Sequence, residues 1–598
     1  MQDFARTMKR KVISFRADTA MLWIAAWCMM TGCQGDEPSA SGTPSLTIHY
    51  TVSSDKAMYQ PGEEVQINVA PAVNGTVNVR YKFTGKVIEE SVISGTSFTW
   101  NPPTLDFRGY MAELFEPETE GKPEQILATI GIDISSDWTK FPRYGFLSRF
   151  DDMTELEVDN IMEYLNRHHI NGIQYYDWHY KHHQPLAGTP DNPTPVYRDI
   201  INREIYFETV KKYIDAGHAR NMKAMFYNLV YGALKDAAAN GVQNEWYIFT
   251  NAARTEKDKH PLSPPFISDI FITDPGNTGW QQYLMDESRN VYSALPFDGF
   301  HMDQLGNRGT RYDYNGSIVN LPGGFQSFIE TIDADDPARY NVLNAVNQYG
   351  QSAIAESPVD FLYTEVWGPN DTYNDLANII IQNNSLSDQQ LQTVLAAYVN
   401  YALADSPGYF NTASVLMADA VIFAFGGAHL ELGEHMLGKE YFPNNNLAMP
   451  DDLKRELVVY YDFMVAYQNL LRDGGIFNDP MLIPADGKLQ FKNWPAQPGN
   501  VAVVGKDFGT RQVLHLLNFT NAQTMQWRDN GGVQTVPTEV ENARLRFTPP
   551  KPVAKVWYAS PDFQKGASGE IDFVTTGNQI SFTIPALRYW SMIVIEYH

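Results

Sequence analysis

The stretch Gly299-Phe-His-Met-Asp303, followed by the loop Gln304-Leu-Gly-Asn-Arg-Gly309, decides the fold class. A short apolar run that ends on an acid and passes into a loop is typical of a buried strand in a parallel sheet. Side chains alternate along a strand, so His301 and Asp303 share one face. The run Phe361-Leu-Tyr-Thr-Glu365 has the same form. The sequence therefore predicts two strands that each carry a carboxylate at the carboxyl end.

Six further runs of this kind flank these two, and helical segments separate them. Such alternation is typical of parallel βα units. Eight strands over residues 139–475 predict a central (β/α)8 TIM barrel with insertions, closed by a helix over 452–471. The expected strands are 144–148, 172–176, 223–228, 299–303, 340–344, 361–365, 394–398 and 428–432. The clearest expected helices are 155–168, 204–220, 279–294 and 411–423.

Short strands with period-two alternation lie on both sides of this region. Runs beginning at 46–52 predict an immunoglobulin-like β-sandwich over residues 45–138. Runs at 512–519 and 579–585 predict a second β-sandwich over residues 476–598. The chain has 598 residues, too many for one hydrophobic core, so we expect several domains.

The first 33 residues have the features of an export signal. Basic residues precede the apolar run 20–30, which is too short to span a bilayer. Thr31-Gly-Cys33 resembles a bacterial lipobox, so we expect Cys33 to carry a lipid anchor and residues 34–44 to form a polar tether; a buried helix is the alternative. The pair Asp36-Glu37 resembles surface-export signals of Bacteroidetes lipoproteins. The sequence thus predicts an exported bacterial lipoprotein, periplasmic or on the outer-membrane surface.

Charge and cysteine content narrow the function. The formal net charge of −25 argues against a nucleic-acid partner, which requires a basic surface. It fits a protein that acts on a neutral or cationic partner. Both cysteines, Cys28 and Cys33, lie in the export signal, so we expect no disulfide and no thiolate metal site in the folded part.

Paired carboxylates suit glycoside hydrolysis. One attacks the anomeric carbon of the sugar or activates water, and the other, whose pKa must be raised, carries a proton to the leaving oxygen. The alternative for Asp303 and Glu365 is a structural role with satisfied hydrogen bonds. Other strand-end side chains are candidates for hydrogen bonding to sugar hydroxyls, or else for orienting loops: Asp177, Asn228, His301 and Glu431. Three aromatic residues are candidates for stacking on sugar rings, or else for core positions: Tyr176, Trp178 and Trp367.

The run His179-Tyr-Lys-His-His183 raises the question of a metal. Its spacing matches no helical zinc motif, and no neighbouring acidic pair completes a site. The sequence also lacks a phosphate-binding glycine loop and a Gly-x-Ser-x-Gly motif. We therefore expect neither a metal nor a cofactor.

One family resemblance is specific. Phe297-Asp-Gly-Phe-His-Met-Asp-Gln-Leu-Gly306 resembles the nucleophile region of glycoside hydrolase family 66, which contains dextranases and cycloisomaltooligosaccharide glucanotransferases. Tyr363-Thr-Glu-Val-Trp-Gly-Pro369 resembles its acid/base region. Further blocks in family order occur at residues 169–186, 226–233, 426–437 and 440–446. The family's immunoglobulin-like domain before the barrel and β-domain after it also match the domain boundaries given above.

The resemblance implies that Asp303 is the nucleophile and Glu365 the general acid/base of a retaining endo-dextranase. It implies dextran and isomaltooligosaccharides as partners, and we expect a monomer. It also suggests Tyr176, Asp177, Trp178, Asn228, Trp367 and Glu431 as cleft residues.

Two alternatives remain. The cyclising transferases of the family contain an inserted carbohydrate-binding module within the barrel, whereas about 30 residues separate the seventh and eighth expected strands here, which favours hydrolysis. The other alternative is a surface glycan-binding lipoprotein that has lost catalysis; the presence of both carboxylates argues against it.

Overall fold

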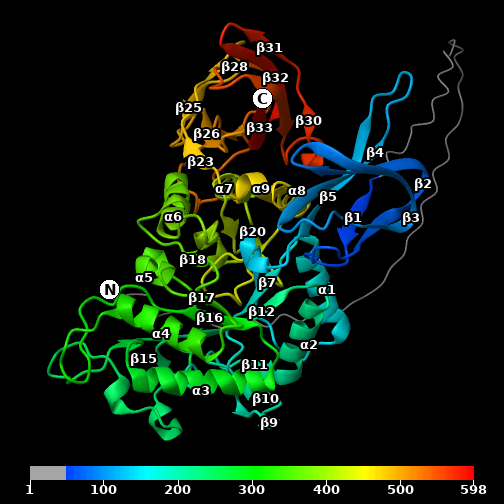
Figure 1. The fold of residues 1–598 in the computed structure, drawn as a ribbon. Coiled ribbons are helices and arrows are strands. Elements are labelled where there is room, and N and C mark those ends of the chain that lie inside the picture. The colour runs from blue at the N-terminus through cyan, green and yellow to red at the C-terminus, as the bar shows by residue number, and fades with distance from the viewer. Residues whose placement is uncertain (1–48) are drawn as a thin grey trace, which may run out of the picture. The chain divides into compact units, whose positions relative to one another are not determined.

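The computed structural model describes residues 49–598 (Figure 1). The predicted signal segment, Cys33 and the tether lie outside these residues. Within the described part, no helix is long and apolar enough to cross a membrane.

The N-terminal part is an antiparallel sheet of five strands. These are β1 (Thr51–Ser54), β2 (Val65–Phe83), β3 (Lys86–Trp100), β4 (Arg108–Glu116) and β5 (Gln125–Ile134). They are ordered β1-β2-β4-β5, with β3 paired to β2. Alternate side chains form an apolar cluster in which the rings of Tyr81 and Trp100 stack at 4.1 Å.

A parallel-sheet region follows, and all eight strands predicted for it are present. The first sheet contains β6 (Tyr144–Leu147), β7 (Gly172–Tyr175), β12 (Lys223–Leu229), β16 (Gly299–Asp303) and β17 (Tyr340–Leu343), in the order β17-β16-β12-β7-β6. The second contains β18 (Leu362–Glu365), β19 (Thr393–Ala396) and β21 (Ala428–His429).

Backbone contacts join these two sheets at both edges. Asn344, after β17, forms a parallel bridge with Tyr363 of β18. At the other edge, the amide of Phe146 in β6 donates a 3.0 Å hydrogen bond to the carbonyl of Leu432, after β21. Side chains of both sheets share one apolar cluster, which includes Tyr144, Phe146, Tyr363 and Leu430.

Helices separate the parallel strands along the chain. They are α1 (Glu155–Arg167), α2 (Phe207–His218), α3 (Thr278–Ala294), α4 (Leu321–Asp335), α5 (Gln351–Ala355), α6 (Tyr373–Leu386), α7 (Thr412–Ala424), α8 (Asp451–Ala466) and α9 (Gln468–Leu471). Thr154 and Glu157 form a capping box that begins α1. The helix predicted from residue 204 begins later, because Glu204–Tyr206 forms strand β11. The predicted final helix is two helices, separated at Tyr467.

Short strands lie in the connections of the parallel region. Besides β11 they are β8 (Gly188–Thr189), β9 (Asn192–Pro193), β10 (Val196–Arg198), β13 (Gly232–Ala233), β14 (Lys259–His260), β15 (Ile270–Ile272), β20 (Gly408–Tyr409) and β22 (Leu447–Ala448). They give structure to the long loops that follow β7, β12, β19 and β21.

The C-terminal part consists of two sheets that share an apolar cluster. One contains β23 (Ile476–Asn478), β25 (Phe491–Asn493), β26 (Val501–Asp507), β27 (Arg511–Asn518), β29 (Val553–Ala559), β30 (Gly569–Glu570) and β33 (Trp590–Tyr597). The other contains β24 (Leu482–Pro484), β28 (Val540–Phe547), β31 (Phe573–Thr576) and β32 (Gln579–Leu587). The strands predicted at 512–519 and 579–585 are confirmed.

The N-terminal sheet packs directly on α8. A Cβ atom added at Gly109 would lie 2.0 Å from the carbonyl oxygen of Val465, and one at Gly131 would lie 2.5 Å from that of Asp462. The amide of Gly131 donates a 3.1 Å hydrogen bond to Oδ1 of Asp462. Only glycine permits this approach of strand to helix.

Candidate active site

A cavity of about 540 Å³ lies at the carboxyl ends of the parallel strands. Asp303, the last residue of β16, and Glu365, the last residue of β18, both line it. Two loop segments complete the wall: His260 to Ile270 from the loop after β12, and Glu440 to Phe442 from the loop after β21. The structure thus brings together the two acids that the sequence places at strand ends.

One amide group connects the two carboxylates. Nδ2 of Asn344 lies 2.8 Å from Oδ1 of Asp303 and 3.3 Å from Oε2 of Glu365. The two oxygens are therefore no more than about 6 Å apart, below the roughly 6.5–9.5 Å separation of inverting glycosidases. The amide oxygen of Asn344 accepts a hydrogen bond from the backbone of Glu365, which fixes its orientation.

Three donors surround the carboxylate of Asp303. The hydroxyl of Tyr227 donates at 2.8 Å, the backbone amide of Gln304 at 2.8 Å and Asn344 at 2.8 Å. Burial raises the pKa of Asp303, and these hydrogen bonds oppose the rise. Donors of this kind stabilise the ionised form, as a nucleophile requires.

Glu365 has a different electrostatic environment. Burial and the charge of Asp303 raise its pKa to about 7, although hydrogen bonds from Tyr398, Trp367 and Asn344 oppose the rise. The hydroxyl of Tyr398 donates at 2.6 Å to Oε1. A carboxyl group with a pKa near neutrality can deliver a proton and then accept one, as a general acid/base does.

Four of the predicted substrate-contact residues line the cavity: Tyr176, Asp177, His301 and Trp367. The ring of Tyr176 stacks on Phe442 with 4.0 Å between centroids. Burial lowers the pKa of His301 to about 3, so its imidazole is neutral. A neutral ring can accept or donate a hydrogen bond without adding charge beside the acids.

Asp177 is unusual among these four. Its backbone is left-handed, with φ of 52°, which is rare outside glycine, asparagine and aspartate. Burial raises its pKa to about 7, with Arg203 opposing and the charges of Asp199 and Asp303 adding to the rise. Its carboxylate accepts no hydrogen bond from any side chain or backbone group of residues 49–598, so it is available to a ligand in the cavity.

Three predicted contact residues do not line the cavity. Trp178 is 0% exposed and packs against Phe226 and Phe297 in the core. Asn228 is also fully buried and holds His182 through both its ring and its carbonyl. Trp178 therefore fills space in the core, and Asn228 orients His182.

Glu431 is likewise directed away from the cavity. Leu430, beside it, enters the apolar cluster shared by the two parallel sheets, so strand alternation turns Glu431 towards the helices. There the hydroxyl of Tyr461 donates at 3.0 Å to its Oε1. Its surroundings are those of a structural carboxylate.

Sequence reasoning assigned no role to Tyr227, Asn344 and Tyr398, which hold the two acids. A signal for two of them was present: Asn344 and Tyr398 end the runs predicted for the fifth and seventh strands. The strand-end rule, applied to polar as well as acidic residues, indicates both positions. Tyr227 precedes a strand end and points inward by alternation.

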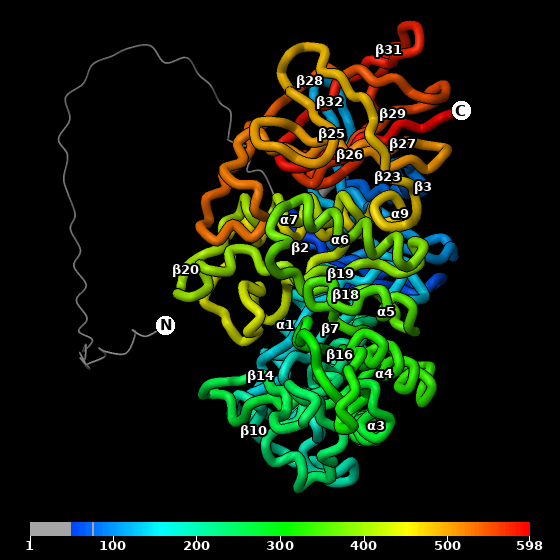
Figure 2. The backbone as a smooth tube through the Cα atoms, turned by 90° about the vertical axis from the view of Figure 1, so that its left-hand side faces the viewer, coloured from blue at the N-terminus to red at the C-terminus, as the bar shows by residue number. Residues whose placement is uncertain are grey.

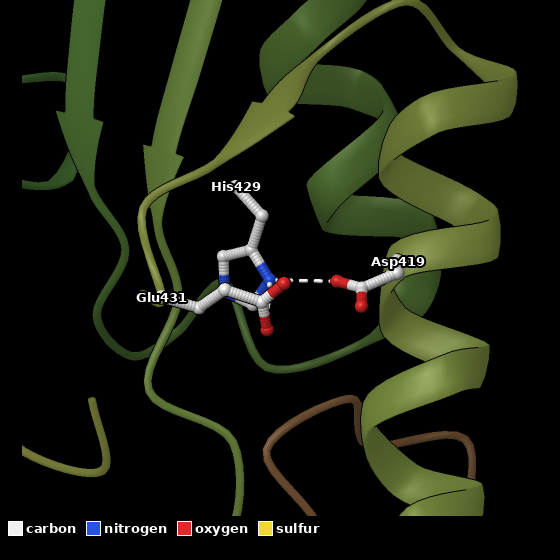
Figure 3. Close-up of side chains that lie close together, drawn as sticks. All are labelled: Asp419, His429 and Glu431. Carbon is white, nitrogen blue, oxygen red and sulfur yellow. Dashed lines mark hydrogen bonds and ion pairs between the residues drawn. The ribbon is translucent and has the colours of Figure 1, made fainter. Parts of the chain in front are cut away.

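Asp419 of α7, His429 at the end of β21 and Glu431, two residues further, form a buried cluster (Figure 3). Their possible ligand atoms lie within 4.8 Å of one another, which makes them a candidate metal group. Nδ1 of His429 lies 2.7 Å from Oδ1 of Asp419, and Nε2 lies 2.8 Å from the carbonyl of Ala397. Both ring nitrogens thus face acceptors.

A protonated imidazole accounts for this arrangement. Burial lowers the pKa of His429, but the charges and hydrogen bonds of Glu431 and Asp419 outweigh it and raise the pKa well above its usual value. An imidazolium donates from both nitrogens and leaves no lone pair for a metal. In the described residues, neither His179, His182 nor His183 belongs to a candidate metal group.

Comparison with known proteins places this site in a family. Glycosyl hydrolase family 66 matches residues 54–594. A cycloisomaltooligosaccharide glucanotransferase of Niallia circulans is 27% identical over an alignment of 725 positions, which covers 93% of this chain and 72% of that protein. A dextranase of Streptococcus salivarius is 23% identical over 541 residues, covering 78% of this chain and 65% of that one.

A solved structure agrees with these matches. The crystal structure of a Paenibacillus sp. cycloisomaltooligosaccharide glucanotransferase complexed with cycloisomaltoheptaose has a TM-score of 0.83 and 25% sequence identity. The superposition covers 91% of this chain and 99% of that one. Since the family match extends from the N-terminal sheet to the last C-terminal strand, the chain belongs to glycosyl hydrolase family 66.

Proposed function

We propose that this protein is an endo-acting, retaining dextranase that cleaves α-1,6-glucosidic bonds of dextran to isomaltooligosaccharides. The observation that carries the proposal is the Asn344 amide shared by Asp303 and Glu365, which limits the separation of the two acids to about 6 Å. Retaining glycosidases hold their carboxyl groups roughly 5–5.5 Å apart, because no water lies between nucleophile and sugar.

The first step forms a covalent glucosyl-enzyme. A carboxylate oxygen of Asp303 bonds to C1 of the glucosyl unit as the bond from C1 to the leaving oxygen breaks. Glu365 gives its proton to that oxygen, which leaves as a hydroxyl of the shortened chain. The pKa of about 7 at Glu365 supports this role, since a large share of the molecules carries this proton near neutral pH before the step.

The second step releases the sugar. The now ionised Glu365 takes a proton from water, whose oxygen bonds to C1 as the ester bond to Asp303 breaks. Both carboxyl groups return to their starting states. The three donors around Asp303 support its leaving-group role, because they stabilise the carboxylate that this step regenerates.

Dextran is proposed because one relative is named a dextranase and because the site contains the paired acids of a glycosidase. The second candidate is a glucanotransferase that forms cyclic isomaltooligosaccharides, the name of two other relatives. Their alignments run over 725 and 756 positions, more than this chain's length, so those proteins contain segments that this chain lacks. That difference favours hydrolysis over cyclisation here.

Two features of the architecture belong to the same proposal. We infer that the eight parallel strands form a closed (β/α)8 barrel over residues 139–475, supported by the backbone contacts at both edges of the two sheets. We infer a β-sandwich over 476–598, supported by two sheets that share one apolar cluster. An immunoglobulin-like β-sandwich over 45–138 stays a proposal from the sequence, since strands β1 to β5 are hydrogen-bonded into a single sheet. Lipidation at Cys33 after removal of residues 1–32 is proposed from the sequence, with export and a membrane anchor as its consequences.

The decisive experiment incubates the purified protein with dextran and, separately, with starch, and separates the early products. We expect linear isomaltooligosaccharides from dextran alone. Rings that outnumber linear products identify a transferase instead. If neither polymer yields reducing ends or rings, the remaining alternative is a binding protein without catalysis, and the proposed function fails. Proton NMR of the first product gives the anomeric configuration, which must be α for a retaining enzyme.

A further inference from the structure

A loop of the C-terminal part contacts the loops that follow β18 and β19. Residues 525–534 lie between β27 and β28, and the amide and indole of Trp527 donate hydrogen bonds to the carbonyls of Asp371 and Asn370, in the loop after β18. The carbonyl of Arg528 accepts a 2.7 Å hydrogen bond from Asn400, after β19. Figure 2 shows the orange part of the chain reaching down towards β20 and α7.

Arg528 extends from this loop to the residues around Glu365. Its Nη2 donates at 2.8 Å to the carbonyl of Val366, which directly follows Glu365, and its Nη1 donates at 3.5 Å to the carbonyl of Tyr398. Tyr398 in turn donates its hydroxyl to Glu365. A single guanidinium thus fixes two chain segments that contact the acid/base.

The same guanidinium packs against three aromatic rings. It lies 5.1 Å from the ring centroid of Trp367, 5.3 Å from that of Tyr401 and 4.5 Å from that of Trp527. Trp367 lines the cavity. Arginine is suited to this position because its planar fork both donates to carbonyls and stacks on rings, which lysine does not reproduce.

Arg528 forms no ion pair with an acidic side chain of residues 49–598, although the residue is only 7% exposed. A buried, unpaired cation is costly, so its retention requires compensation. The titratable groups whose charge acts on it are Asp371 and Glu365 from β18 and its loop, and Tyr398 and Tyr401 after β19. Asp529, the next residue on its own loop, accepts a hydrogen bond from Ser414 instead. The field of Arg528 therefore favours the ionised form of Glu365.

We propose that Arg528 is a positioning residue of the active site, supplied by the C-terminal part, that holds Tyr398 and Trp367 in place around Glu365. The proposal rests on the function proposed above, because it assigns Glu365 the acid/base role. It also makes the C-terminal part a component of the site and more than a stabilising attachment.

The test compares Arg528→Met and Arg528→Lys with the control Arg588→Met. Arg588 lies in the same part of the chain, pairs with Glu456 and stacks on Tyr589, away from the cavity. We expect Arg528→Met to lower kcat about 10- to 100-fold, with a smaller change in KM, because displaced groups around the acid/base slow the chemical step. Loss of a cation near Glu365 raises the pKa of that carboxyl group. The basic limb of the profile of kcat/KM against pH should therefore move to higher pH.

In Arg528→Lys the positive charge remains, so the basic limb of the pH profile should stay near its wild-type position. The planar guanidinium is lost, so kcat should still fall. Arg588→Met should change neither quantity. Wild-type kcat and an unchanged pH profile in Arg528→Met overturn the proposal. So does a loss of activity that only tracks the fraction of unfolded protein, measured by circular dichroism.

Hydrogen exchange provides a readout that does not depend on substrate. In Arg528→Met, amides of residues 366–372 and 397–402 should exchange faster than in wild type, whereas those of Arg588→Met should not. Unchanged exchange contradicts the positioning role. If the wild type fails to act on dextran, the proposed function fails on its own, and the exchange experiment still decides the structural role of Arg528.

Discussion

The hydroxyl of Tyr398 lies 2.6 Å from Oε1 of Glu365 and donates a hydrogen bond to it. Tyr227 has the same relation to Asp303, at 2.8 Å. Each acid is therefore paired with its own phenol, and the Asn344 amide lies between them. A donor stabilises the ionised carboxylate, so each tyrosine lowers the pKa of one particular acid. The two acids can consequently be addressed separately by mutation.

Removal of either phenol should move one limb of the pH profile. In wild type, kcat/KM should fall as pH rises through about 7, where Glu365 loses its proton. Tyr398→Phe raises the pKa of Glu365, so this basic limb moves to higher pH. Tyr227→Phe raises the pKa of Asp303, so the acidic limb moves to higher pH instead. Profiles of kcat/KM on dextran against pH measure both limbs. If each variant moved the limb assigned here to the other, the nucleophile and acid/base roles of Asp303 and Glu365 would have to be exchanged.

Loss of either acid should abolish most activity. Asp303→Asn and Glu365→Gln should each reduce dextran hydrolysis by about 10²–10⁴, because one loses the nucleophile and the other the proton donor. Release of reducing ends at fixed protein concentration measures the change. Glu208→Gln, an exposed position on α2, is the matched control. Near-normal turnover in either active-site variant would remove the assignment.

The raised pKa of Glu365 also has a cost in stability. Between pH 4.5, the ordinary pKa of a glutamate, and about 7, the folded protein keeps the proton on Glu365 whereas the unfolded chain releases it. The free energy of unfolding therefore falls as pH rises through that window. Glu365→Gln has no titrating proton at this position, so its free energy of unfolding does not fall for this reason. Its Tm should match wild type near pH 4 and exceed it by about 2 °C or more at pH 8. Differential scanning calorimetry at both pH values decides, and equal Tm at pH 8 contradicts the prediction.

Trp178 and Trp367 should respond differently to truncation. Trp178→Ala empties a core position and should lower the free energy of unfolding by about 3–5 kcal/mol, while protein that remains folded keeps its KM. Trp367→Ala removes a cavity-lining ring and should raise KM for dextran roughly 3- to 10-fold. Denaturant titration and steady-state kinetics measure the pair. A normal KM in Trp367→Ala would show that this ring does not contact substrate.

Chelation tests the cluster of Asp419, His429 and Glu431. Both ring nitrogens of His429 face acceptors, so a protonated imidazole accounts for the geometry. Overnight dialysis against EDTA should therefore leave activity and Tm unchanged. Elemental analysis should find less than one metal ion per chain. A stoichiometric metal whose removal lowers Tm, and whose return restores it, would contradict this interpretation.

The sequence by itself determined the strands and the two acids at their ends. Apolar runs such as 299–303 and 361–365 are local signals, because burial on both faces of a parallel strand requires apolar residues throughout. Each of the eight predicted strands is present, with ends shifted by a few residues. The family resemblance depends on the same local stretches, and the match over residues 54–594 agrees with it.

Only the tertiary structure decided which strand-end side chains face the cavity. The left-handed backbone at Asp177 turns the chain so that its carboxylate lines the cavity while Trp178 enters the core. Alternation after β21 directs Leu430 inward and Glu431 towards α8, where Tyr461 binds it. If the alternation shifts by one residue, an inward side chain becomes an outward one and the assignment is reversed. The periodicity of the sequence does not specify the conformation of a loop, so it cannot predict where such a shift occurs.

The contacts that hold the acid/base were also beyond the sequence. Arg528 lies far along the chain from Glu365, in a loop with no strand or helix pattern of its own, and its partners are backbone carbonyls. A carbonyl is present at every residue, so no side-chain motif marks it as a partner. Local patterns therefore determined where the acids lie on the chain, whereas the packing of distant loops decided what surrounds them.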